Sequence, residues 1–253
     1  MIRFASLGSG SKGNALLVES GATRVLLDCG FGPRELARRL ARLAIVPESI
    51  AAVLITHEHA DHVGGAARCA ARYGWRVHAS FGTAAASRQL EGVPVHRFDS
   101  HTAFAIGDLE IHPYPVPHDA REPTQFVFSD GASRLGVLTD AGSITPHIVA
   151  MLKECAALVL ECNHDAAMLA NGRYPPPLKQ RIAGAYGHLD NGQAAELLRA
   201  IGSARLRHVV AAHLSEENNR PELARAALAE ALNCTSDWIG VATQNDGVGW
   251  LAV

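Results

Sequence analysis

Residues 56–62 read Thr-His-Glu-His-Ala-Asp-His, which places three histidines and an aspartate within six residues. From the chain's own residue frequencies, a chance HxHxDH pattern is expected with odds on the order of one in a thousand. His57 and His59 point the same way on an extended segment and can share one cation, while Asp61 and His62 lie in a turn where they can face a second. A solvated polar turn is the alternative, but packing these groups together has no structural benefit without a metal. A fold of this chain must therefore bring further ligands to this motif.

Three further candidate ligands each come directly after an apolar, strand-like run: His118, Asp140 and His213. Each has an ordinary alternative, namely a capped turn for His118, a helix N-cap for Asp140 and a satisfied core histidine for His213. Their occurrence beside the HxHxDH motif favours metal ligation. Asp28, another carboxylate at a strand end, is interpreted as orienting a ligand histidine without touching metal. Imidazole and carboxylate together suit zinc and tolerate manganese or iron.

The remaining pattern predicts strands in runs, separated by helices. Strands are expected at 2–7, 15–19, 24–28, 51–56, 76–79, 93–98, 109–115, 125–129, 134–139, 208–212 and 248–253. Helices are expected at 33–43, 63–73, 145–152, 175–182, 191–201 and 221–232. This order indicates an α/β (α+β) class in which two sheets pack face to face under helices. With no linker or repeat, residues 1–253 are expected to form one domain.

The composition excludes several partners. The formal net charge is −2, so no global attraction to nucleic acid or to an anionic membrane is expected, and an anionic substrate must be held by local groups and metal charge. No apolar run approaches the roughly 20 residues needed to cross a bilayer, and no signal peptide is evident, so a membrane partner is not expected. Five scattered cysteines without a CxxC pair are typical of reduced thiols, which predicts a cytoplasmic protein. The sequence leaves the oligomeric state open.

Two segments are candidates for holding phosphate. The loop 9–14 offers backbone N–H groups, the hydroxyls of Ser9 and Ser11, and Lys12, a composition suited to an oxyanion; a simple tight turn is the alternative. The helix expected at 33–43 carries four arginines, which could follow a phosphate backbone, although a solvated face is favoured.

The ordered set of residues resembles the metallo-β-lactamase superfamily, matching it through Asp28, His57-x-His59-x-Asp61-His62, His118, Asp140 and His213. Within that superfamily the chain is similar to the YycJ/WalJ-type nucleases. The longer strings that carry this similarity are GSGSKGN at 8–14, ECNHD at 161–165, GAYGHLDN at 184–191 and HLSEENN at 213–219. Asp190 departs from the GHLSN usual in relatives; it can still cap the following helix, but it adds negative charge near the proposed phosphate site.

The resemblance implies a four-layer αββα sandwich with the site at one edge of the two sheets. It implies one cation bound by His57, His59 and His118. The other cation would be bound by Asp61, His62 and His213, with Asp140 bridging the two. Zinc and manganese are the cations it indicates.

The same resemblance implies a dinuclear phosphodiesterase, foremost a 5′-to-3′ DNA exonuclease linked to DNA repair, in which a hydroxide bridging the metals attacks the phosphorus. Asp61 and His188 are the catalytic candidates; His188 would contact phosphate or protonate the leaving group, with capping of the helix near Asn191 as its alternative role. Hydrolysis of a small phosphodiester or thioester is a second hypothesis, although a thioester leaves His188 and loop 9–14 without a task. A non-catalytic, metal-containing module that binds nucleic acid is a third, and the complete ligand set argues against it.

Overall fold

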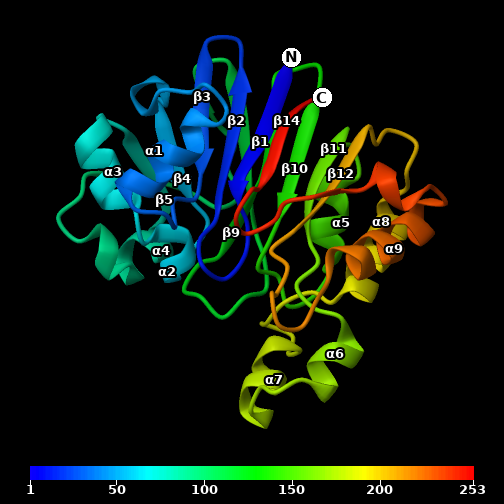
Figure 1. Ribbon diagram of the computed structural model, residues 1–253. Helices are drawn as coiled ribbons and strands as arrows, with labels where there is room; N and C mark the ends of the chain where they lie inside the picture. The colour runs from blue at the N-terminus through cyan, green and yellow to red at the C-terminus, as the bar shows by residue number, and fades with distance from the viewer.

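The computed structural model describes residues 1–253 as two seven-stranded mixed sheets packed face to face, with helices on both outer faces (Figure 1). This confirms the predicted αββα sandwich. The first sheet has the order β14-β1-β2-β3-β4-β5-β6. Its strands are β1 (Ile2–Gly8), β2 (Ala15–Ser20), β3 (Thr23–Leu27), β4 (Ala52–Ile55), β5 (Arg76–Ser80), β6 (Val95–Phe98) and β14 (Val248–Ala252).

The second sheet has the order β13-β12-β11-β10-β9-β8-β7. Its strands are β7 (Phe104–Ile106), β8 (Leu109–Pro115), β9 (Thr124–Ser129), β10 (Arg134–Leu138), β11 (Ala157–Glu161), β12 (His208–Ala212) and β13 (Gly240–Val241). The helices are α1 (Pro33–Ala41), α2 (Ala60–Val63), α3 (Ala66–Tyr73), α4 (Phe81–Ala86), α5 (Pro146–Leu152), α6 (Ala166–Asn171), α7 (Pro176–Ile182), α8 (Asn191–Ile201) and α9 (Pro221–Leu232). None of them combines the length and the apolarity that crossing a bilayer requires.

Three apolar clusters hold the layers together. One lies between the sheets, one between the first sheet and its helices, and one between the second sheet and α5, α8 and α9. In β2, Leu16 and Val18 face the central cluster while Leu17 faces the outer one. Because both faces of each sheet are covered, the central strands have continuous apolar sequences rather than alternating apolar and polar residues.

The structure differs from the predicted elements in two informative places. The helix expected at 63–73 is two helices, α2 and α3, separated by Gly64 and Gly65. A Cβ on Gly65 would lie 1.8 Å from the backbone oxygen of Phe31, so the chain approaches too closely there for a side chain. The strand β11 is absent from the prediction, although Ala157–Leu160 is fully apolar and buried.

The sheet directions bring distant residues to one edge. β3 and β4 are parallel in the first sheet, and β10, β11 and β12 are parallel in the second. The carboxyl ends of parallel strands meet at a common edge, where rigid strands present side chains on short loops. The residues at or just after those ends are Asp28, His57, Asp140, Glu161 and His213.

Candidate metal centre

The structure gathers all seven predicted metal ligands at this edge, between the two sheets. They come from the loop between β4 and α2 (His57, His59), from α2 (Asp61, His62) and from the loops after β8, β10 and β12 (His118, Asp140, His213). The donor atoms form overlapping sets in which every member lies within 4.8 Å of the others. Those sets include His57, His59 and His118; Asp61, His62 and His213; and His57, His62 and Asp140.

The donor chemistry of this cluster fits divalent cations. His57 Nε2 and His213 Nε2 are buried and have no hydrogen-bond partner in the protein. A buried polar atom left without a partner is costly, and a cation in each of the two triads would give each nitrogen a partner. Asp140 belongs to a set with a histidine from each of the other two triads, which is the position that a shared carboxylate requires.

The backbone turns sharply at three site residues. Asp28, Asp140 and His213 have positive φ angles of 61°, 54° and 54°. The left-handed region is sterically unfavourable for residues other than glycine, and only two further non-glycine residues of the chain adopt it. Each turn directs the side chain at a strand end towards the centre, so the fold accepts local strain to place these groups.

Asp28 contacts His62 in the way the sequence suggested. Its Oδ2 lies 2.8 Å from His62 Nδ1, and its Oδ1 accepts a hydrogen bond of 2.9 Å from the backbone N–H of Thr56. Burial raises the pKa of Asp28, against the lowering effect of His62 and Thr56. Held at Nδ1 by the carboxylate, His62 presents Nε2 to the cluster, where it lies 3.2 Å from Asp140 Oδ2.

We expect Asp28→Asn to weaken cation binding about ten- to a hundredfold, because an amide no longer holds the His62 ring in one tautomer. Competition with a chromogenic chelator measures the affinity. Thr56→Ser, which keeps the hydroxyl beside Asp28, is the matched control and should bind as the parent does. Unchanged affinity in Asp28→Asn would show that Asp28 serves only the fold.

Glu161, at the end of β11, is a site residue that the sequence reading missed. Its Oε1 lies 2.8 Å from His188 Nδ1 and 3.2 Å from His213 Nδ1. Its Oε2 accepts hydrogen bonds of 3.0 and 3.1 Å from the backbone N–H groups of Ala141 and Leu189. Burial raises the pKa of Glu161, but the two histidines outweigh this and lower it to about 2. The available signal was an apolar run ending in a carboxylate, the same pattern that drew attention to Asp28.

His188 lies at the rim of the cluster, not at a helix cap. The N-cap of α8 is Asp190, whose side chain accepts a hydrogen bond of 2.8 Å from Gln193 N–H in a capping box, as expected for Asp190. The alternative capping role of His188 is therefore wrong. Its Nδ1 is held by Glu161, while Nε2 makes no hydrogen bond within the protein. Burial lowers the pKa of His188, but Glu161 and Asp140 raise it above its usual value.

In loop 9–14, some side chains make buried contacts at the site and others are exposed to solvent. The Ser9 hydroxyl accepts a hydrogen bond of 2.8 Å from the backbone N–H of His213, so it is engaged in positioning that ligand. Asn14, a second residue that the sequence reading missed, places Nδ2 3.1 Å from His62 Nε2. Ser11 is exposed, and Lys12 is an exposed cation paired with Glu216.

Three of the four arginines expected on a solvated helix face, Arg34, Arg38 and Arg42, are exposed as the sequence favoured. The fourth, Arg39, is buried. Its guanidinium donates to the backbone oxygens of Leu7 at 2.6 Å and Gln244 at 2.9 Å. Arg42 also donates to Leu7 O, at 3.0 Å. These contacts fasten α1 to β1 and to the loop before β14. Arg38 pairs on the surface with Glu35.

Charges in the cluster are arranged for cations. Burial lowers the pKa of His57 well below its usual value. Burial also works to lower the pKa of His62 and of His213, but the surrounding carboxylates, with Asp140 foremost, raise the first well above its usual value and the second to about 10. In the metal-free protein, protons therefore sit where the carboxylates converge, and cation binding displaces them.

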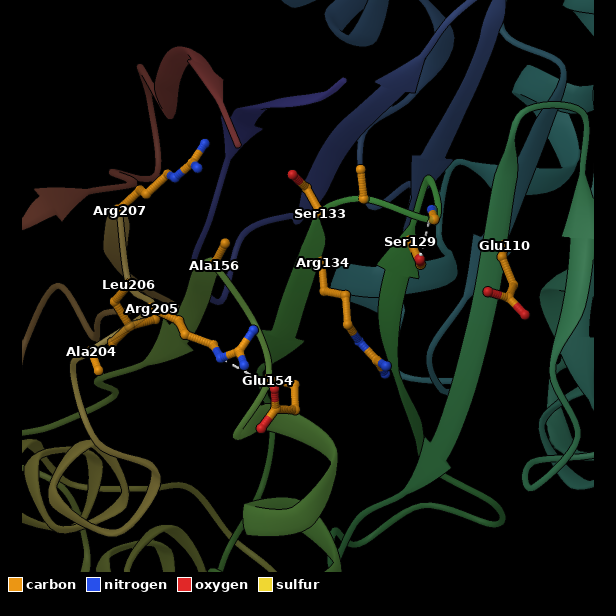
Figure 2. Close-up of a pocket in the computed structure, with 12 residues that line it drawn as sticks. Glu110, Ser129, Ser133, Arg134, Glu154, Ala156, Ala204, Arg205, Leu206 and Arg207 are labelled. Carbon is orange, nitrogen blue, oxygen red and sulfur yellow. Dashed lines mark hydrogen bonds and ion pairs between the residues drawn. The ribbon is translucent and has the colours of Figure 1, made fainter.

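A cavity of about 680 Å³ lies away from this cluster (Figure 2). It is at the opposite edge of the second sheet, where β10, β11 and β12 begin, and Arg134, Arg205 and Arg207 line it together with carboxylates. Arg205 pairs with Glu154 at 3.2 Å. The metal-ligand cluster and this arginine-lined cavity thus occupy opposite ends of the same strands.

Comparison with known proteins places the chain in a family. A model of the beta-lactamase superfamily domain matches residues 23–213. Exodeoxyribonuclease YycJ of Bacillus anthracis is 33% identical over 235 residues, covering 91% of this chain and 89% of its own. Exodeoxyribonuclease WalJ of Streptococcus pneumoniae is 32% identical over 246 residues, covering 94% and 91%. The solved metallo-β-lactamase fold protein YhfI of Bacillus subtilis shares the fold, with a TM-score of 0.77 at 14% identity over 100% of both chains.

The matched range extends from β3 to His213 and so includes every member of the ligand cluster. The curated relatives extend the similarity over most of the chain. The fold carries divalent metal ions in this superfamily, and the buried histidines and aspartates here have the chemistry to hold them. The chain therefore belongs to the beta-lactamase superfamily, among the metal-dependent hydrolases that include the YycJ and WalJ exodeoxyribonucleases.

Proposed function

We propose that the protein is a dinuclear phosphodiesterase that degrades DNA from a 5′ end, with zinc or manganese as the native cation. The observation that carries the proposal is the division of the donors into two triads joined by one carboxylate. His57, His59 and His118 form the first ligand set. Asp61, His62 and His213 form the second, and Asp140 is shared.

Two cations in such a site lower the pKa of water from 15.7 towards about 7 and neutralise charge on the phosphoryl oxygens. The remaining requirement is a proton for the departing oxygen. His188 meets it, since Glu161 fixes Nδ1 and leaves Nε2 open at the rim. Asp61, whose Oδ2 lies 3.5 Å from His62 Nε2 and 3.6 Å from His213 Nε2, combines ligation with orientation of the attacking water.

DNA is the proposed substrate because the two relatives that match most of this chain are named exodeoxyribonucleases. The polarity follows the family resemblance. A long polymer also gives a task to Ser11 and Lys12, the exposed polar groups of loop 9–14, in which Ser9 contacts the backbone of His213.

We expect chelator treatment to abolish DNA cleavage and Zn²⁺ or Mn²⁺ to restore it. Oligonucleotides labelled at either end report polarity: a 5′ label should leave as a short product from the start, while a 3′ label should stay on progressively shorter chains. A chromogenic phosphodiester and a thioester serve as controls. Cleavage of the thioester alone would overturn the assignment, and internal cuts would replace the exonuclease by an endonuclease.

A further inference from the structure

Two of the strings that carry the family resemblance meet at one pair of side chains. GAYGHLDN at 184–191 ends with Asn191, and HLSEENN at 213–219 ends with Asn219. Both asparagines are 5% exposed, and neither belongs to the ligand cluster. Asn191 Nδ2 donates to Asn219 Oδ1 at 3.0 Å, and Asn219 Nδ2 donates to Asn191 Oδ1 at 2.9 Å. The two side-chain amides therefore form a reciprocal pair, closed by two hydrogen bonds.

Asn219 uses its whole hydrogen-bonding capacity in this contact and two others. Its Nδ2 also donates to the backbone oxygen of Cys162 at 2.7 Å, and its Oδ1 also accepts from the backbone N–H of Arg220 at 2.8 Å. A side-chain amide has two donor hydrogens and two acceptor lone pairs, so all four are engaged. A buried amide with four partners is held in a single orientation, and it is rigid for that reason.

The pair joins three loops at the edge of the sandwich where the metal centre lies. Cys162 belongs to the loop after β11, Asn191 is the first residue of α8, and Asn219 lies in the loop between β12 and α9. The backbone N–H of Asn191 also donates to the backbone oxygen of His164 at 2.9 Å, which adds a second link between α8 and the loop after β11. The three loops are therefore fastened to one another behind the site.

These same loops carry Glu161, His188 and His213. Glu161 Oε1 lies 2.8 Å from His188 Nδ1 and 3.2 Å from His213 Nδ1. One oxygen can face both rings only while the loops keep their spacing. His213 has further anchors, since its backbone N–H donates to Ser9 Oγ at 2.8 Å and its backbone oxygen accepts from Asn163 Nδ2 at 3.0 Å. The His188 ring has its one hydrogen bond with Glu161, so it depends most on that spacing.

We propose that the Asn191–Asn219 pair positions His188 for proton donation by fixing the spacing of these three loops. The two asparagines are positioning residues, because they contact the loops and not the ligand cluster. The inference rests on the proposed phosphodiesterase function and adds to it two residues on which the proton donor depends. Misplacing a reacting group by about 1 Å can lower a rate on the order of a hundredfold, so loss of the pair should be visible in turnover.

The test compares Asn191→Ala, Asn219→Ala and the double variant as metal-loaded proteins, well below their unfolding temperatures. We expect each single substitution to lower kcat on a labelled DNA oligonucleotide about tenfold or more, with KM and metal content close to those of the parent. Because both substitutions break the same pair, the double variant should lose no more than the weaker single variant. Losses that multiply, or a loss of metal, would overturn the proposal.

Hydrogen exchange of residues 187–191 gives a readout that does not depend on turnover. The backbone N–H of Leu189 donates to Glu161 Oε2 at 3.1 Å, and that of Asn191 to the backbone oxygen of His164. Loops released from the pair open more often, so these amides should exchange about tenfold faster in Asn219→Ala than in the parent. Parental exchange in the variant would overturn the role of the pair.

Ile201→Ala is the matched control. Ile201 ends α8 at the opposite end from Asn191 and packs in the apolar cluster between the second sheet and its helices. It should lower the unfolding temperature without changing kcat or the exchange of residues 187–191. The same behaviour in the asparagine variants would make the pair a structural contact only and overturn its positioning role. A parent that cleaves no phosphodiester would instead reject the proposed function, and hydrogen exchange would still decide whether the pair holds the His188 loop.

Discussion

His188→Ala should retain the bound metal and lose phosphodiesterase turnover by about a hundred- to ten-thousandfold, the range that a positioned proton donor contributes. The reason is geometric. Glu161 holds Nδ1 of the ring at 2.8 Å, and Nε2 is free of protein partners at the rim of the cluster. Removing the ring leaves the seven ligands in place but takes away the group that protonates the departing oxygen.

The measurements are kcat on a labelled oligonucleotide and metal content by elemental analysis of the same preparation. His147→Ala, an exposed histidine on α5, is the matched control and should behave as the parent. His188 also lies within a set of donors formed with Asp140, Glu161 and His213. Loss of metal from His188→Ala would therefore identify it as a ligand and remove it from the role of proton donor.

A second variant separates chemistry from positioning. Glu161→Gln keeps the shape of the side chain but loses the charge that holds His188, so its kcat should fall less than that of His188→Ala. The pH profile carries the distinction, because a neutral amide lowers the pKa of His188 and the activity should decline at lower pH than in the parent. A parental profile would mean that Glu161 acts only through the backbone N–H groups of Ala141 and Leu189.

The ligands could be predicted from sequence because each carries a local signal. His57 to His62 form a dense motif. His118, Asp140 and His213 each follow an apolar run, a short-range pattern that can be recognised without knowledge of the fold. Two sheets covered by helices also followed from the order of the elements. The sequence could therefore predict both the metal ligands and the approximate arrangement of the sheets and helices.

What sequence could not supply depends on contacts between distant residues. The run before Glu161 begins with alanines a few residues after a helix, so its periodicity does not distinguish strand from helix. Arg39 resembles a surface residue until Leu7 and Gln244, 32 and 205 residues away, offer it their carbonyl oxygens. The break at Gly65 arises from the approach of Phe31, which no pattern within the helix reveals.

Asp140→Asn is the sharpest test of the paired-cation centre. Asparagine tolerates the left-handed backbone that residue 140 adopts, at a φ of 54°, so the variant should remove the charge and preserve the turn. A shared carboxylate replaced by a neutral amide binds each cation less well. Loss of a residue that only orients a ligand typically weakens metal binding about ten- to a hundredfold. We expect Asp140→Asn to weaken it by more than that, and activity to fall with it.

Elemental analysis against protein concentration decides the outcome, with Asp130→Asn as the matched control. Asp130 lies in the turn between β9 and β10, at the opposite end of β10, where it pairs with the chain's amino terminus. Loss of both ions in Asp140→Asn but not in Asp130→Asn fits a carboxylate that both cations share, because each cation then loses one charged ligand. Loss of a single ion would assign Asp140 to one triad, and full occupancy would refute the bridge and leave the two triads as independent sites.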